Sequence, residues 1–162
     1  MKFYIETIDH KDQRYPTVGD WCTGFLYDDN YGGGNVVSGI DKDGKYLVIR
    51  VSEVGDWRME ALVGIHELVE AILCIDKGIS QESVDEFDIA FEKARSLAEN
   101  NVAADTIAYA GYGVNIDSEP GDHPAAPYHI QHGYATAVER MLCAAMNIPW
   151  ATYESRLKEL DG

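Results

Sequence analysis

The segment ALVGIHELVEAILCI, residues 61–75, places one imidazole and two carboxylates in the middle of an otherwise apolar sequence. On a helix, residues three or four positions apart share a face, so Glu70 is a neighbour of both His66 and Glu67. A helix that is apolar on nearly all sides is buried, and an unpaired buried carboxylate costs several kcal/mol. These groups therefore need a partner, which either a divalent cation or an arginine can supply.

A second polar stripe lies in PYHIQHGYATAVER, residues 127–140. It runs through His129, His132, Thr136 and Glu139 at helical spacing. His132 lies deeper in the expected helix than His129, so we predict His132 as a metal ligand. The alternative for each histidine taken alone is a surface residue or a capped core residue. His123 belongs to the preceding loop, and we expect it to be solvated.

A third stripe, Asp85, Asp88 and Glu92, follows on another expected helix. Asp88 lies between Phe87 and Phe91, so it is the member of the stripe that we expect to face inward. A solvated acidic face would give the same pattern, and it stays open as the alternative.

Together these residues predict a metal-binding protein, and we extend this to the hypothesis of a hydrolase that acts on a small molecule or peptide. In this hypothesis His66, Glu70 and His132 coordinate Zn²⁺, Mn²⁺ or Fe²⁺, with Asp88 as a fourth ligand. Glu67 acts as the base for a metal-bound water.

The pattern H-E-x-x-E, from His66 to Glu70, resembles the H-E-x-x-H helix of zincin metallohydrolases. In that family the two ends of the motif bind zinc, and the glutamate is the general base. The resemblance covers about ten residues and implies a metal-dependent hydrolase. Glu70 stands where the family has its second histidine, and no H-x-x-G-x-x-H follows.

The carboxylates also resemble those of the all-α nucleotide pyrophosphohydrolases, which carry E-x-x-E and E-x-x-D on consecutive helices. That resemblance implies a Mg²⁺-dependent enzyme using Glu67, Glu70, Asp85 and Asp88. Against it, the chain opens with a sheet that those helical bundles lack, and hard Mg²⁺ does not need the adjacent histidine.

Over the whole chain, three segments are similar to small proteins encoded in tailed-phage and prophage genomes. These segments are the HELVEA helix, the VDxFDxxFE helix and the EPGD…APY stretch, residues 119–128. The resemblance implies that the protein is encoded by a phage or prophage, and it does not indicate an activity.

The formal net charge of −15 is the most unusual feature of the composition. Such a charge repels nucleic acid and anionic membranes, because binding phosphates requires clustered Lys and Arg. Solubility explains it most simply, and a non-catalytic acidic interaction protein or DNA mimic is the alternative. The N-terminus is not a signal peptide, and Cys74 and Cys143 are expected to be buried reduced thiols, so we expect a cytoplasmic location.

The strands and helices that the sequence predicts, and that must position these residues, form a single α+β domain over residues 1–162. A small antiparallel sheet of three to four strands occupies roughly residues 1–53, and helices occupy roughly residues 56–160. Strands are expected at residues 2–8 and 22–27, and as a hairpin at 35–40 and 45–51. Helices are expected at residues 57–76, 83–99, 127–147 and 149–160. The connection at residues 100–127 is long enough to suggest a cover over the site.

Overall fold

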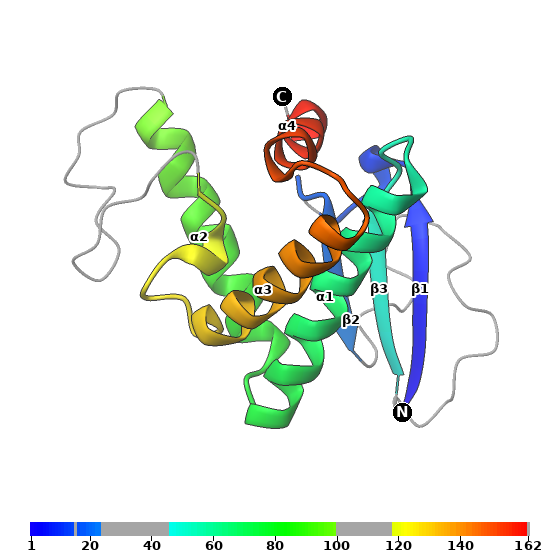
Figure 1. The fold of residues 1–162 in the computed structure, drawn as a ribbon. Coiled ribbons are helices and arrows are strands. Elements are labelled where there is room, and N and C mark those ends of the chain that lie inside the picture. The colour runs from blue at the N-terminus through cyan, green and yellow to red at the C-terminus, as the bar shows by residue number, and fades with distance from the viewer. Residues whose placement is uncertain (15, 24–45, 100–117, 162) are drawn as a thin grey trace. The chain divides into compact units, whose positions relative to one another are not determined.

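The structure is a computed structural model that describes residues 1–14, 16–23, 46–99 and 118–161. Within these ranges the chain forms three strands followed by four helices (Figure 1). The strands are β1 (Lys2–Ile8), β2 (Gly19–Thr23) and β3 (Tyr46–Ser52). The helices are α1 (Trp57–Lys77), α2 (Gln81–Glu99), α3 (His129–Ala145) and α4 (Trp150–Asp161). Two 3₁₀ turns are η1 (His10–Asp12) and η4 (Pro120–Asp122). This order confirms the predicted α+β class.

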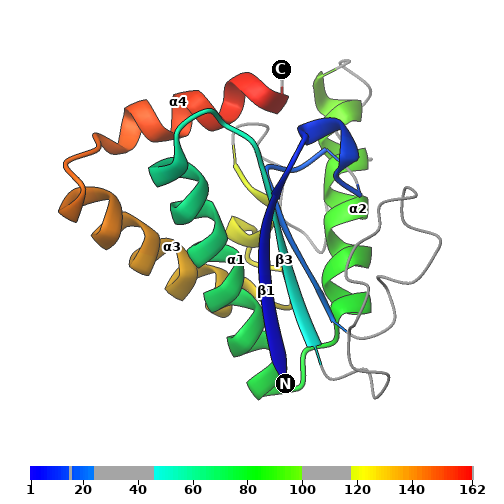
Figure 2. The same ribbon diagram turned by 90° about the vertical axis from the view of Figure 1, so that its right-hand side faces the viewer.

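The sheet has the strand order β1-β3-β2, with β3 in the centre (Figure 2). β2 runs antiparallel to β3, with Trp21 opposite Ile49. β1 runs parallel to β3, with Ile5 opposite Ile49. The expectation of an antiparallel sheet is therefore wrong for the β1–β3 pair. Alternation of apolar and polar residues fixes the face that each side chain takes, but it is the same for both pairing directions.

α1 packs on one face of the sheet. Gly64 lies against this face, because a Cβ on it would meet Ile5 and Val51 at 3.4 Å. Trp21 projects from the same face, since it is paired with Ile49 and strand residues two apart share a side. The sheet and α1 therefore bring a tryptophan of β2 to the helix that carries His66.

The opposite face of the sheet carries polar and charged side chains beside the buried Cys22 and Val48, and the segment around η1 bonds to several of these polar groups. Arg50 of β3 pairs with Glu6 of β1 at 2.8 Å. Arg14 donates two hydrogen bonds of 2.6 Å to the carboxylate of Asp20 in β2. Gln13 donates to the backbone oxygen of residue 18 and to the hydroxyl of residue 52. These partners satisfy the charges that the sheet buries.

Both ends of α1 follow from local sequence. Asp56 caps its first turn, with a carboxylate oxygen accepting from the backbone N–H of Arg58 at 3.0 Å. Glu60 accepts from the backbone N–H groups of Val54 and Gly55, which fixes the approach of the chain to the helix. The helix ends at Gly78, whose φ of 69° is in the left-handed region.

The helix expected at residues 83–99 begins two residues earlier, because α2 starts at Gln81. The hydroxyl of Ser80 accepts from the backbone N–H of Ser83 at 3.2 Å, so Ser80 caps the helix. Val84, Phe87 and Phe91 of α2 are buried.

α3 and α4 agree closely with the predicted helices. α3 covers His129–Ala145, starting two residues after Pro127. Asn147 follows it with a positive φ of 56°, which reverses the chain before α4.

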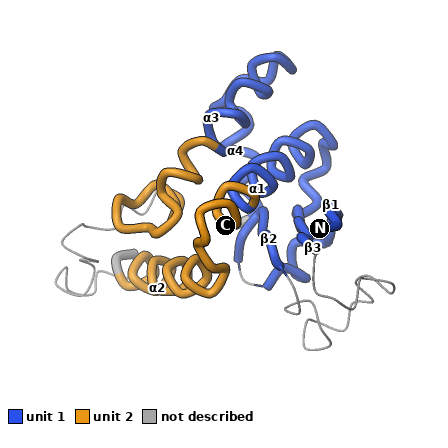
Figure 3. The backbone as a smooth tube through the Cα atoms, turned by 90° about the horizontal axis from the view of Figure 1, so that it is seen from below, with its two compact units in different colours: residues 1–71, 135–162 blue, residues 72–134 orange. Residues whose placement is uncertain are grey.

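The chain divides into two compact units, coloured separately in Figure 3. Unit 1 comprises Met1–Ala71 and Ala135–Gly162, and unit 2 comprises Ile72–Tyr134. Unit 1 holds the sheet, most of α1, the second half of α3, and α4. Unit 2 holds α2, η4 and the first turns of α3.

Some predictions fall outside the described residues. They are the first hairpin strand at residues 35–40 with its turn, the end of the second expected strand at residues 24–27, and most of the connection at residues 100–117. β2 begins three residues before the strand expected at residue 22.

In the part of the chain that the structure describes, no helix is long and apolar enough to cross a membrane. Cys22, Cys74 and Cys143 are buried, as predicted for the last two.

Candidate metal centre

His66 and Glu139 form a buried hydrogen bond within unit 1. Nδ1 of His66, on α1, lies 3.0 Å from Oε2 of Glu139, on α3. His66 is 6% exposed and Glu139 is also 6% exposed. A carboxylate on one ring nitrogen fixes the orientation of an imidazole and leaves the other nitrogen, Nε2, to act elsewhere.

Glu139 is itself held in place by Tyr153 of α4. The phenol O–H of Tyr153 donates a short hydrogen bond to Oε1, the other carboxylate oxygen of Glu139. Tyr153 is among the largest fully buried side chains. The imidazole of His66 is thus positioned by a chain of two buried groups, a carboxylate and a phenol, which come from α3 and α4.

Glu70 lies one turn after His66 on α1, and its carboxylate approaches the second ring nitrogen. Nε2 of His66 is 3.6 Å from Oε2 of Glu70, which is longer than a good hydrogen bond. Oε1 of Glu70 accepts from the indole N–H of Trp21 at 3.0 Å. Each of the two side chains therefore has one atom tied to a buried partner, while its other atom points toward the neighbouring side chain.

The electrostatics of this cluster favour a cation. Burial by itself lowers the pKa of His66, but the carboxylates of Glu139 and Glu70 outweigh burial and raise that pKa well above its usual value. Glu67 adds to the same effect through its charge. A positive charge at this point, either a proton on His66 or a metal ion, is what the surrounding carboxylates stabilise.

His132 belongs to unit 2 and is 5% exposed. Its Nε2 lies 3.2 Å from Oε2 of Glu119 and 3.4 Å from Oδ1 of Asp122. The hydrogen bond with His132 lowers the pKa of Asp122 despite partial burial. Gly121 lies between the two acidic residues, and a Cβ on it would overlap the His132 ring.

His66 and Glu70 of unit 1 are buried, at 6% and 5% exposed, and His132 of unit 2 is 5% exposed. Two nitrogens and one carboxylate oxygen are donors that Zn²⁺ and related transition metals accept. These are the three residues predicted as ligands from the sequence.

The other predicted site residues are only half-buried. Glu67 is half-buried, and its carboxylate packs near Gly19 of β2, where a Cβ would lie 2.6 Å from Oε1. Asp88 is half-buried and accepts a hydrogen bond from the hydroxyl of Tyr128. Asp85 is also half-buried. The roles of Glu67 as a base, of Asp88 as a fourth ligand and of Asp85 as a magnesium ligand stay predictions.

The two remaining histidines of this region differ in burial. His129 is exposed, as expected from its place at the start of α3, and its Nδ1 lies 2.9 Å from the backbone oxygen of Gly121. The prediction that His123 is solvated is wrong, because it is 4% exposed. Its ring packs between Phe87 and Phe91 of α2, with centroid distances of 5.7 and 5.9 Å. A loop position does not reveal a packing partner on a distant helix.

Sequence reasoning missed the residues that hold the ligands in place. Trp21 and Tyr153 lie far from His66 in the sequence, and neither belongs to a motif. Glu139 was in the predicted stripe of α3, but its contact with Nδ1 of His66 needs the tertiary structure. The EPGD stretch was noticed only as a resemblance, and it turns out to face His132.

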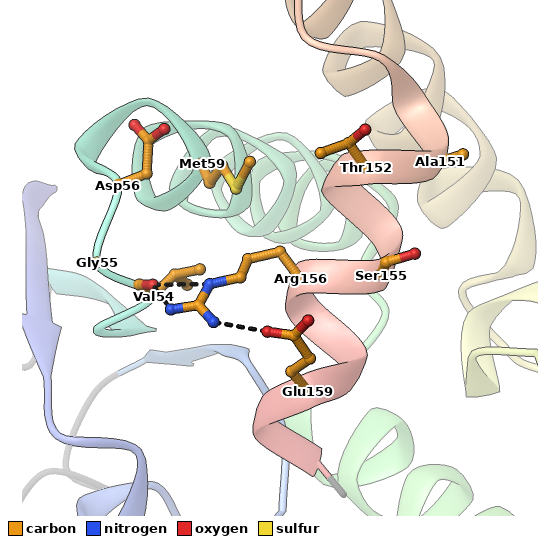
Figure 4. Close-up of a pocket in the computed structure, with 9 residues that line it drawn as sticks. All are labelled: Val54, Gly55, Asp56, Met59, Ala151, Thr152, Ser155, Arg156 and Glu159. Carbon is orange, nitrogen blue, oxygen red and sulfur yellow. Dashed lines mark hydrogen bonds and ion pairs between the residues drawn. The ribbon is translucent and has the colours of Figure 1, made fainter.

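A surface hollow of about 570 Å³ lies elsewhere in unit 1, between the start of α1 and α4 (Figure 4). Arg156 crosses it, donating to the backbone oxygen of Val54 at 2.7 and 3.1 Å and to Glu159 at 2.6 Å. None of the candidate ligands lines this hollow. The guanidinium ties α4 to the turn before α1, which is a structural role.

Comparisons of the chain with protein-family models, with curated proteins and with solved structures found no significant match.

Proposed function

We propose that this protein binds a transition-metal ion, Zn²⁺, Mn²⁺ or Fe²⁺, through His66, Glu70 and His132, and that it uses the ion for hydrolysis. The observation that carries the proposal is the buried pair of His66 and Glu70 on α1, whose Nε2 and Oε2 atoms lie 3.6 Å apart. Buried carboxylates and imidazoles are otherwise rare without charged partners.

The arrangement around His66 and Glu70 supports a ligand role for both. Ligating histidines usually have their other ring nitrogen hydrogen-bonded to a carboxylate, and ligating carboxylates are hydrogen-bonded in turn. Glu139 does this for His66, and Trp21 does it for Glu70. The 3.6 Å between Nε2 and Oε2 is close to the separation of about 3.3 Å between two ligands of a tetrahedral zinc ion.

The donor set favours a transition metal over Mg²⁺. Mg²⁺ prefers oxygen ligands, whereas imidazole nitrogen suits Zn²⁺ and Fe²⁺. Asp85 and Asp88, which the pyrophosphohydrolase alternative requires, are half-buried on α2, and Asp88 accepts a hydrogen bond from the hydroxyl of Tyr128. The transition-metal reading is therefore the one we retain.

For the hydrolysis, we assign the role of general base to Glu67, which follows His66 on α1. In the H-E-x-x-H pattern, which the sequence from His66 to Glu70 resembles, the second residue is the general base for the metal-bound water. Glu67 is half-buried, so its carboxylate keeps some access to solvent. Glu67→Gln should keep the metal and abolish metal-dependent hydrolysis of a panel of peptides and p-nitrophenyl esters, whereas unchanged hydrolysis by this variant would exclude Glu67 as the base.

The metal content of protein purified without a histidine tag tests the binding proposal. Wild-type protein should carry, or take up after chelation, about one equivalent of metal per chain. His66→Gln should lose it. His10→Gln is the matched control, since His10 lies in the same unit but is bonded to the hydroxyl of Ser52. Wild-type protein that takes up no Zn²⁺, Mn²⁺ or Fe²⁺ would instead support a buried polar network without a metal.

A further inference from the structure

β1 is the outer strand of the described sheet, on its edge in Figure 1. One edge of β1 pairs with β3 over the whole length of the strand, and no strand among the described residues pairs with its other edge. The sequence of β1, KFYIETI, contains neither glycine nor proline, and the pairing keeps one register throughout. An edge of this kind presents a row of backbone N–H and C=O groups to a further strand.

Two large apolar side chains of β1 are exposed on the face of the sheet that α1 packs on. Phe3 and Ile5 are 56% and 55% exposed. Gly64 of α1 fixes the face, because a Cβ on it would meet Ile5 at 3.4 Å. Phe3 is two residues from Ile5 and shares its side of the sheet. Exposed apolar side chains beside an open strand edge indicate a surface that another strand can cover.

The same apolar surface continues onto one flank of α1. The other flank lies over β2, since a Cβ on Gly19 would lie 2.7 Å from Cγ1 of Val63. Because an α-helix has 3.6 residues per turn, Ile65 and Leu68 lie on the flank away from Val63, and both are half-buried. The surface formed by β1 and this flank belongs entirely to unit 1.

The sequence of β1 is complementary to itself when two copies run antiparallel. With Tyr4 on a two-fold axis, residue 2 lies opposite residue 6 of the second copy, and residue 3 lies opposite residue 5. Lys2 then faces Glu6, and Phe3 faces Ile5. Opposite charges and aromatic–aliphatic pairs directly across antiparallel strands are stabilising. Moving the axis to either neighbouring residue brings no opposite charges together, so the sequence favours this register.

We propose that two copies of this chain pair through their β1 edges, antiparallel and centred on Tyr4. The sheets of the two copies then join into one continuous sheet. A two-fold axis perpendicular to the sheet keeps both α1 helices on the same face, so Phe3 and Ile5 of both copies meet in one strip between the helices. The pairing satisfies the backbone groups of the open edge and removes apolar side chains from water.

Sedimentation equilibrium of the full chain over a range of protein concentrations tests the proposal. Wild type should show a reversible monomer–dimer equilibrium. Lys2→Glu places like charges opposite each other at both ends of the pairing, so its dimer should be weaker by about tenfold or more. Lys158→Glu makes the same charge change at an exposed position of α4, and as the matched control it should dimerise like wild type. Wild type that stays monomeric at all concentrations would overturn the proposal, and so would equal dissociation constants for K2E and K158E.

A cysteine cross-link tests the register. Tyr4→Cys should form a covalent dimer on oxidation, because directly opposite residues of antiparallel strands have Cβ atoms about 4.5–5.5 Å apart. Thr7→Cys is the control, since its two copies would lie about 20 Å apart along the strands, beyond the reach of a disulfide. Wild type, whose three cysteines are buried, gives the background.

A Y4C variant that dimerises without cross-linking would overturn the proposal, as would efficient cross-linking of T7C. Neither measurement involves a metal ion, so dimerisation and the proposed metal binding can fail separately.

Discussion

Nε2 of His66 and Oε2 of Glu70 face each other at 3.6 Å, one helical turn apart on α1. The spacing of four residues puts them on one face, and burial removes the water that would otherwise separate them. Their remaining polar atoms are engaged by Glu139 and Trp21. The side chains of His66 and Glu70 are thus held in position before any metal binds. We therefore expect metal affinity to depend strongly on Glu139 and Trp21.

Glu139→Gln should weaken Zn²⁺ binding by about 10- to 100-fold, because it removes the charged partner of Nδ1 of His66. Competition with a chromophoric chelator measures the change. Glu154→Gln, an exposed change on α4, is the control and should bind as wild type does. Equal affinities for the two variants would show that Glu139 does not position the ligand.

Trp21→Phe should keep the fold and weaken metal binding by about tenfold, since it removes only the indole donor to Glu70. The loss of a buried hydrogen bond should also lower the free energy of unfolding of the metal-free protein by about 1–3 kcal/mol. Chemical denaturation and metal titration of the same samples separate the two effects. A stability loss with unchanged metal affinity would restrict Trp21 to the core.

Metal binding should tighten as pH rises, because a ligating imidazole must be neutral and the pKa of His66 is raised well above its usual value. The metal-free protein should respond in the opposite sense. A raised pKa gives stability that is fully present below the unfolded-state pKa, about 6.5, and is lost as pH rises through the folded-state pKa.

Thermal melts from about pH 6 upward therefore measure both effects. The Tm of metal-free wild type should fall over this window more than that of His66→Gln, while added Zn²⁺ should offset the fall. Parallel pH profiles for the two metal-free proteins would mean that the His66 pKa is not raised on folding.

Gly121→Ala and Gly133→Ala should have opposite effects on stability. A Cβ on Gly121 would overlap the ring of His132, so this change should destabilise the protein and displace the turn from the ligand. Around Gly133, within α3, nothing in the described structure lies within 4 Å of an added Cβ. Replacing that glycine should stabilise the helix by about 0.5–1 kcal/mol. Urea denaturation of both variants tests the sign, and a destabilised G133A would contradict the open space at this position.

Local patterns predicted much of the site and of the fold. The apolar helix around His66 and Glu70 and the polar stripe of α3 need only helical periodicity, so the sequence alone singled out three polar residues that are buried in the structure, while their role as ligands stays a prediction. Trp21 escaped because a strand pattern shows which face a residue takes, but not which helix covers that face. The buried state of His123 escaped for the same reason, since its partners lie on α2.

The direction of β1 was missed because parallel and antiparallel strands share the same alternation. The start of α2 was misplaced because Ser80 and Ser83 are both plausible caps, and only the hydrogen bond to the Ser80 hydroxyl distinguishes them. In both cases the local sequence allows two structures, and contacts with other parts of the chain determine which one forms.

The parallel pairing of β1 with β3 also sets an order for folding during synthesis. Lys2 pairs with Tyr46 and Ile8 with Ser52, so among the described strands the first one made finds its partner only when β3 leaves the ribosome. β2 precedes β3 and cannot replace it, because β1 and β2 both pair with β3 rather than with each other. Non-local pairing of this kind slows folding. Until β3 is made, Phe3 and Ile5 belong to a strand without this partner, and transiently unpaired strands of this kind favour aggregation.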